Sequence, residues 1–282
     1  MPASSSRGGQ HLSEQDWWER LSQSRRAPLN PQDLVEAYGQ VHSPELRQAL
    51  VEHLAIGSGE PGVACLLKLL EQRGREPQLV RALGLSNHPR AGALLLSWIH
   101  DPAVDQALLL ASLEAWAHQV PLDAIAEALQ ASSSRMRLAG LQLLQHHTAR
   151  LEVQQLLRFC AEPLADFREP VVIATLAVLR RLDDSSVVAA LKDLVLENRS
   201  LQLSQRALEA IGSMATPASV VALVQLGACG LDVEVDEEAR RQLRSQFRHH
   251  DVMMAELERL VHHGHVNPTS AAELSDLIAS GF

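Results

Sequence analysis

The sequence predicts an all-α fold, an α-solenoid in which about seven pairs of helices stack one on the next. The first observation is an apolar pair, three residues apart, that returns about every thirty residues within helical sequence. A unit of this length cannot bury its own apolar face, so it must stack on its neighbours. The second observation is that no segment alternates apolar and polar residues for long enough to form a strand. The pairs are Val51 with Leu54, Val80 with Leu83, Leu110 with Leu113, Leu141 with Leu144, Leu176 with Leu179, and Leu208 with Ile211.

The third observation is that prolines stand where helical patterns begin. Proline suits the first turn of a helix because its missing N–H would have no partner there. Several prolines also follow a residue that can cap a helix, namely in Asn30-Pro31, Ser43-Pro44, Asp101-Pro102, Thr216-Pro217 and Asn267-Pro268. Proline in this chain therefore indicates helix starts.

The N-terminal region divides into two parts. Residues 1–12 are small and polar, and we expect them to be disordered. An N-terminal capping helix is predicted within 13–30, because Ser13 can cap it and acidic residues follow in its first turn. Trp17 and Trp18 on this helix predict a docking contact with the first repeat or with a second subunit.

The repeats are predicted to occupy residues 31–250, with short connections that imply antiparallel neighbours. First helices are expected at Gln32–Gln40, Gly62–Gln72, Arg90–His100, Leu122–Ala131, Leu151–Cys160, Ser186–Glu197 and Ala218–Ala228. Second helices, which carry the recurring apolar pair, are expected at Glu45–Ala55, Gln78–Leu85, Ala103–His118, Ser134–His146, Val171–Leu182, Leu201–Ala215 and Glu237–His249.

The C-terminal region is predicted to close the stack. Residues 227–238 are acidic and loosely patterned, which favours a hinge or a bent loop. Residues 251–282 are predicted to form C-terminal capping helices at Met253–His262 and Ser270–Ala279, because the terminal units of a stack need more polar covers.

Composition excludes several classes of function. The net charge of −9 argues against nucleic acid as a ligand, because phosphate binding requires a basic surface. The chain has neither an apolar leader nor a run of eighteen apolar residues, so we expect a cytoplasmic protein without membrane insertion. Cys65, Cys160 and Cys229 are widely spaced, which favours buried small side chains over disulfides or a metal site.

A family resemblance follows from the segments that surround the apolar pairs. Arg206-Ala207-Leu208-Glu209-Ala210-Ile211-Gly212 is similar to the end of a second helix in HEAT-like repeats of the short kind. Asp101 to Leu113, Arg135 to Leu144 and Ser185 to Leu191 resemble other parts of that unit, and the resemblance covers roughly residues 43 to 250. The chain departs from the pattern in its short second unit and in lacking a clear Gly-Asp turn after the second helix.

Short HEAT-like repeats are typical of the E/F-type phycobilin lyases and of related phycobilisome maturation proteins. The resemblance implies attachment of a linear tetrapyrrole (bilin), a substrate and not a permanent cofactor, to a cysteine of a phycobiliprotein. It also implies a second HEAT-like subunit as a partner. No residue role is carried over from that family, because no invariant catalytic motif of it can be placed in this sequence.

The residues themselves indicate a binding surface and no catalytic set. The sequence lacks a phosphate loop, an HExxH motif and a Gly-x-Ser-x-Gly elbow. His262, His263 and His265 are close in sequence, but they lack a nearby cysteine and acids of their own, so no metal site is expected.

The candidate site is a set of arginines on the second helices of the C-terminal half, which the resemblance places on the inner wall of the stack. Such a ladder would bind carboxylates of a bilin or of a protein partner. The alternative is that the same arginines pair with local acids. Two tryptophans are either core residues or a flat wall for a ligand. The predicted binding residues are Trp98, Trp116, Arg137, Arg180, Arg181, Arg206, Arg240 and Arg241.

Two functions therefore remain open. The first is a chromophore-handling factor similar to phycobilin lyases, which would work by proximity while the acceptor's cysteine acts as the nucleophile. The second is a non-enzymatic adaptor or assembly scaffold that binds a protein and no pigment. Whether the chain is an enzyme is left open between them.

Overall fold

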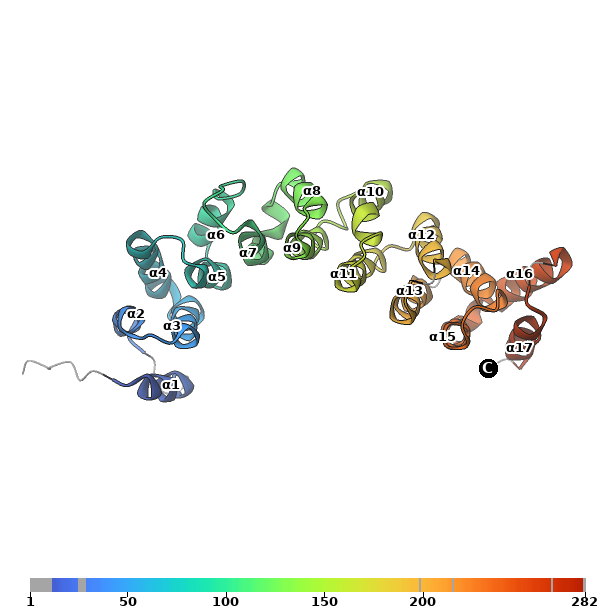
Figure 1. Ribbon diagram of the computed structural model, residues 1–282, viewed down its shortest axis with the longest axis horizontal. Coiled ribbons are helices and arrows are strands. Elements are labelled where there is room, and N and C mark those ends of the chain that lie inside the picture. Colours follow the sequence, from blue (N-terminus) through green and yellow to red (C-terminus); the bar gives the residue numbers. More distant parts are fainter. Residues whose placement is uncertain (1–11, 25–28, 198, 215, 265, 281–282) are drawn as a thin grey trace, which may run out of the picture. The chain divides into compact units, whose positions relative to one another are not determined.

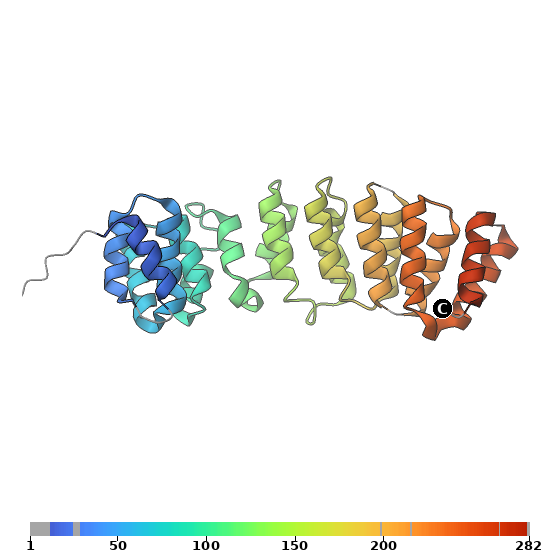
Figure 2. The ribbon, with the colours of Figure 1, turned by 90° about the horizontal axis from the view of Figure 1, so that it is seen from below.

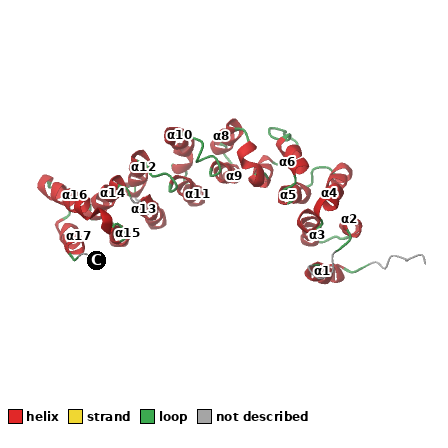
Figure 3. Ribbon diagram, turned by 180° about the vertical axis from the view of Figure 1, so that it is seen from behind, coloured by secondary structure: helices red, strands yellow, loops and turns green. Residues whose placement is uncertain are grey.

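The protein is described by a computed structural model that covers residues 12–24, 29–197, 199–214, 216–264 and 266–280. All regular structure in these ranges is helical, which confirms the predicted all-α class (Figure 3). Contacts divide the chain into two compact units, Met1–Val120 and Pro121–Phe282. Except for Leu12, the segment expected to be disordered lies outside the described residues.

Unit 1 contains α1 and three helix pairs. The bounds are α1 Glu14–Gln23, α2 Pro31–Gln40, α3 Pro44–Gly57, α4 Gly59–Arg73, α5 Pro77–Leu85, α6 Pro89–Leu96, α7 Gln106–Ser112 and a 3-10 helix η1 Glu114–Gln119. The second helices α3, α5 and α7 pack in succession, and the first helices α2 and α4 pack beside them. Helix α1 packs on α3.

Unit 2 contains five helix pairs. Their bounds are α8 Leu122–Gln130, α9 Ser134–Leu144, α10 Val153–Leu164, α11 Glu169–Leu179, α12 Ser185–Leu196, α13 Leu201–Met214, α14 Pro217–Ala228, α15 Val233–Arg244, α16 His250–His263 and α17 Pro268–Ala279, with a short 3-10 helix η2 Phe247–His249. The first helices α8, α10, α12 and α14 form one layer of this unit, and α9, α11, α13 and α15 form the other (Figure 1). The α8–α9 and α10–α11 connections lie at the same edge of the unit (Figure 2).

The recurring apolar pairs form the core, as the period predicts. All twelve of their side chains are buried, with exposures from 0% to 3%. Because aromatic residues are few, leucine, valine and alanine fill the space between helices. Small residues permit the closest approaches. At Gly62 a Cβ atom would lie 2.1 Å from the carbonyl oxygen of Leu54, so α4 can cross α3 closely only with glycine at this position.

Most predicted helix starts are confirmed by their caps. Asn30, Ser43, Thr216 and Asn267 each accept a hydrogen bond from a backbone N–H in the first turn of the helix that follows. The proline after each cap occupies the first helical position, where its missing N–H costs nothing.

The helix predicted at Ala103–His118 is wrong in its start and in its continuity. Asp105 caps α7 by accepting hydrogen bonds from the backbone N–H groups of Ala107 and Leu108, so the helix begins at Gln106. The α-helical geometry then ends at Leu113, and η1 follows. The ring of Trp116 in η1 lies so close to Gly92 that a Cβ atom there would be 2.3 Å away.

The loose acidic segment predicted at 227–238 is also wrong over most of its length. Helix α15 begins at Val233, and Asp232 caps it by accepting a hydrogen bond from the Glu234 N–H. Two of the acids that suggested a loop, Glu234 and Asp236, lie in the first turn of this helix, where carboxylates are stabilised by the helix dipole. At the C-terminus, α16 and α17 form a pair that packs on α14 and α15 like the pairs before it.

Candidate functional site

Arg137 is the most buried of the predicted binding arginines, and its guanidinium forms an ion pair with a carboxylate. Its Nε atom lies 2.8 Å from Oδ2 of Asp166, whose side chain is 1% exposed. Asp166 stands in the loop between α10 and α11, one pair beyond α9. Arg199 reaches the same loop from the following pair and donates to the carbonyl oxygens of Leu164 and Asp166. Three successive pairs are therefore joined here.

Three further arginines of the predicted set also pair with acids. Arg206 forms an exposed pair with Glu209 at 2.9 Å. Arg240 lies 2.5 Å from Glu273 of α17, and Arg241 lies 2.7 Å from Glu238 on its own helix. These contacts favour the alternative in which arginines pair with local carboxylates.

Arg180 and Arg181 differ from the others. Both follow the last residue of α11, and both side chains are exposed. Within the described part of the chain neither makes an ion pair. Two neighbouring guanidinium groups remain available to carboxylates at this point of unit 2.

Both tryptophans of the predicted set are buried, and both lie in unit 1. Trp98 is 5% exposed and lies beneath the guanidinium of Arg75, 4.8 Å from the ring centroid. Trp116 is 7% exposed and packs against Gly92. Neither ring offers an open face, which favours the core role over the ligand wall. The six arginines lie in unit 2, so the predicted set is divided between the two units.

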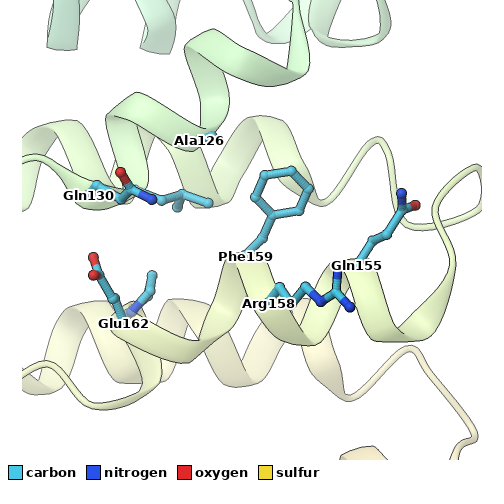
Figure 4. A pocket seen from close by; sticks show the side chains of 8 residues that line it. Ala126, Gln130, Gln155, Arg158, Phe159 and Glu162 are labelled. Carbon is cyan, nitrogen blue, oxygen red and sulfur yellow. The ribbon is translucent and has the colours of Figure 1, made fainter.

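A pocket that was not predicted from the sequence lies between the first helices α8 and α10. Its volume is about 400 Å³. Ala126 and Leu129 of α8 and Phe159 and Pro163 of α10 supply its apolar lining. The Phe159 ring points into the space between the two helices (Figure 4). We call this feature the α8–α10 pocket.

Polar side chains surround the Phe159 ring. Arg158 and Gln155 lie on one side of it, and Glu162 and Gln130 lie on the other (Figure 4). Arg158 and Glu162 are exposed, and neither forms an ion pair with any described residue. A cation and a carboxylate therefore face solvent at opposite ends of an apolar depression, an arrangement typical of ligand sites.

One signal in the sequence could have indicated this pocket. Phe159 is one of four phenylalanines in the chain, and it lies on a helix whose buried residues are Leu156, Cys160 and Pro163. Gln155 and Glu162 lie about one turn before and after it, so all three share a helix face. What could not be foreseen is that α8 leaves this face partly uncovered.

Two buried titratable groups of the core have raised pKa values. Burial raises the pKa of the Cys160 thiol to about 12, so this cysteine is a poor nucleophile near neutral pH. Burial and the neighbouring Glu76 carboxylate raise the pKa of Tyr38 well above its ordinary value. Over the described ranges, no three His, Cys, Asp or Glu residues gather as metal ligands, and His265 lies outside those ranges. No described helix has the length and apolar character needed to span a bilayer.

Comparison with known proteins gives similarities of fold. No protein-family model matches the sequence, and no curated protein is significantly similar to it. The chain is similar to the complex of CpcE and CpcF of phycocyanin lyase from Nostoc sp. PCC7120, with 16% identity, 100% coverage of both chains and a TM-score of 0.43. It is also similar to human deoxyhypusine hydroxylase in complex with glycerol, with 19% identity, 89% coverage of this chain, 96% coverage of that chain and a TM-score of 0.33.

Proposed function

We propose that this chain is a chromophore-handling protein similar to phycobilin lyases, which holds a linear tetrapyrrole and presents it to a protein partner. The observation that supports the proposal is the α8–α10 pocket, with its apolar lining and its charged ends. The resemblance of the sequence to short HEAT-like repeats supplies the class of ligand. The partner would be a phycobiliprotein subunit, and a second HEAT-like subunit would complete the complex.

The chemistry of the pocket suits such a ligand. A linear tetrapyrrole is a conjugated, largely flat molecule with two propionate groups and several pyrrole N–H donors. The Phe159 ring would stack on a pyrrole ring, and the Arg158 guanidinium would bind a propionate. The Glu162 carboxylate would accept N–H donors at the other end of the pocket. A pocket of about 400 Å³ would hold part of the molecule, with the remainder along the exposed rim.

In this proposal the chain contributes position and not acid–base chemistry. The thiolate of the acceptor's cysteine would add to an exocyclic carbon–carbon double bond of the bilin, and a proton would go to the other carbon of that bond. Nothing is oxidised or reduced in this addition. The chain would accelerate it by holding the two reactants in contact, which is worth several kcal/mol when the orientation is good.

The second candidate function is an adaptor that binds a protein and no pigment. The observation that favours it is the exposed pair Arg180 and Arg181, which makes no ion pair among the described residues. Guanidinium groups in this setting would bind acidic side chains of a partner. Such a surface requires no chromophore.

The test is a titration of the full chain with biliverdin, followed by its absorbance and fluorescence. We expect Phe159→Ala and Arg158→Glu each to weaken binding about tenfold, because each removes one contact worth about 1.4 kcal/mol or more. Arg81→Glu is the matched control, since Arg81 is exposed on α5 outside the pocket.

Coexpression with a bilin-producing pathway and candidate phycobiliprotein subunits then tests transfer. Covalent pigment on the acceptor that depends on Phe159 supports the proposal. A chain that binds no biliverdin, transfers no pigment and forms a stable complex with another protein is an adaptor. In that case Arg180→Glu should disrupt the complex.

A further inference from the structure

A groove lies between α1 and α3, at the N-terminal end of unit 1. Its volume is about 350 Å³. Leu21 of α1 and Ala49 and Ile56 of α3 supply most of its apolar surface, and Glu52 and His53 also line it. We call it the α1–α3 groove. It does not involve the α8–α10 pocket or any residue proposed there.

Two large apolar side chains are exposed on these helices, Ile56 in the groove and Trp18 in a separate depression on α1. Ile56 is 69% exposed, and Trp18 is 46% exposed. Trp18 is one turn before Leu21, so both lie on the same side of α1. The neighbouring Trp17 is 6% exposed, which shows that one tryptophan completes the core while the other remains outside. Exposed apolar side chains gathered at a groove mark an interaction surface.

The arrangement of helices in unit 1 explains why the groove is open. Each pair of helices in a repeat protein covers the pair before it. In unit 1 the single helix α1 lies on α3 in place of a full pair. One helix covers less of α3 than two would, and Ile56 and the Leu21 side of α1 remain at the surface.

The described carboxylates that line the groove and the neighbouring depression on α1 give these two surfaces a negative charge. Glu14 and Glu19 lie with Trp18 in a shallow depression on α1, and Glu52 lies in the groove. No described lysine or arginine lines either depression. Burial lowers the pKa of His53, which disfavours the charged form of this ring. Glu14 is engaged, because it accepts hydrogen bonds from the His42 and Ser43 N–H groups. Glu19 and Glu52 accept hydrogen bonds from the uncharged side chains of Gln23 and Gln48, and among the described residues neither forms an ion pair, so both carboxylates can meet a cation of a partner.

We propose that the α1–α3 groove binds an amphipathic helix of a partner protein, with its apolar face on Ile56, Leu21 and Trp18 and its lysines or arginines at Glu19 and Glu52. A helix laid in an apolar groove is a common mode of recognition, and it needs apolar anchors at spacings of three and four residues. The carboxylates at the rim select a basic helix over an acidic one.

The experiment measures binding of a fluorescein-labelled, eighteen-residue leucine–lysine amphipathic helix to the full chain by fluorescence anisotropy. Ile56→Glu is the decisive variant, because it adds a negative charge while removing the apolar anchor. We expect it to weaken binding about tenfold, as loss of an anchor residue does. Glu19→Lys should also weaken binding, whereas Leu85→Glu and Glu71→Lys are matched controls on other exposed positions and should leave affinity unchanged.

The opposite results would overturn the proposal. Attraction by overall charge alone predicts that Ile56→Glu binds as tightly as the unmodified chain or more tightly. A leucine–glutamate helix or a scrambled peptide that binds equally well would also overturn it, as would absence of binding by the leucine–lysine helix. If binding emerges only after residues 2–11 are deleted, this chain's own N-terminal segment is the occupant. All substituted positions are exposed, and circular dichroism verifies that the variants fold.

Discussion

The buried ion pair between Arg137 and Asp166 should be far more important for stability than the exposed pair between Arg206 and Glu209. Arg137→Ala leaves the Asp166 carboxylate, 1% exposed, without its nearest cation, and we expect a loss of about 3–5 kcal/mol in the free energy of unfolding. Arg206→Ala removes an exposed contact worth less than about 1 kcal/mol. Urea unfolding measures both. Equal losses would show that Arg137 is not a structural residue and would return it to the candidate binding surface.

The three cysteines should react in a fixed order. Cys229 is exposed, whereas Cys65 and Cys160 are 5% and 1% exposed. Burial raises the pKa of Cys160 to about 12, and partial burial also raises the pKa of Cys229, so little thiolate is present at pH 7. We expect a thiol reagent to modify Cys229 alone in the native chain, faster as pH rises, and all three cysteines in denaturant. Mass spectrometry of the labelled peptides would show it, and rapid native labelling of Cys160 would contradict this burial.

At the scale of elements, Asp236 joins α15 to its neighbours at an electrostatic cost. Its carboxylate accepts hydrogen bonds from the Leu231 N–H and the Ser270 hydroxyl, and Arg240 lies 3.9 Å away. Burial nevertheless raises its pKa above the ordinary value. A folded-state pKa above the unfolded value means that protonation stabilises the fold, and that this stabilisation is lost as pH rises through the folded-state pKa.

Asp236→Asn should therefore be neutral or stabilising at pH 7. Asparagine keeps the acceptor for Leu231 and removes the buried charge. The difference in unfolding free energy between the variant and the unmodified chain should shrink as pH falls below the raised pKa of Asp236. Urea unfolding at pH 7 and at pH 4 tests the sign. A variant that is strongly destabilised at pH 7 and recovers at pH 4 would mean that the charged form is the favoured one.

The helices could be predicted from the sequence where the determinants are local. Ser43 with Pro44 and Asn267 with Pro268 begin helices through hydrogen bonds within a few residues. The errors arose where the course of a helix depends on a contact with a residue distant in the sequence, as at η1, where Trp116 packs on Gly92. The partner of Arg137 could not be predicted for the same reason, whereas Arg206 and Arg241 pair with acids three residues away, as the alternative in the sequence analysis allowed. Whether Arg137 is free depends on Asp166, which belongs to the next pair of helices.

At the scale of the whole molecule, the thirty-residue period of the apolar pairs predicted the architecture, because each unit buries its apolar face against its neighbour. The binding surface has no such regularity. The α8–α10 pocket exists because one aromatic side chain, Phe159, stands where two first helices do not fully close. The α1–α3 groove exists because the single helix α1 covers α3 only in part. Both features lie where the packing of helices is incomplete. A repeating apolar pattern in the sequence does not indicate where this occurs.

In a repeat stack, a destabilising core substitution should affect neighbouring helices more than distant ones. In unit 2, α9 packs on α8 and α11, while α16 and α17 pack on α14 and α15. Leu143 of α9 is 0% exposed, so Leu143→Ala should cost about 2–5 kcal/mol through lost burial and the cavity left behind. Because each pair contacts its nearest neighbours, protection from hydrogen exchange should fall most in α8, α9 and α11 and least in α16 and α17. Hydrogen-exchange mass spectrometry of the variant measures this gradient. Equal loss across all ten helices of the unit would mean that it unfolds as one cooperative globule, and the nearest-neighbour description would then be wrong.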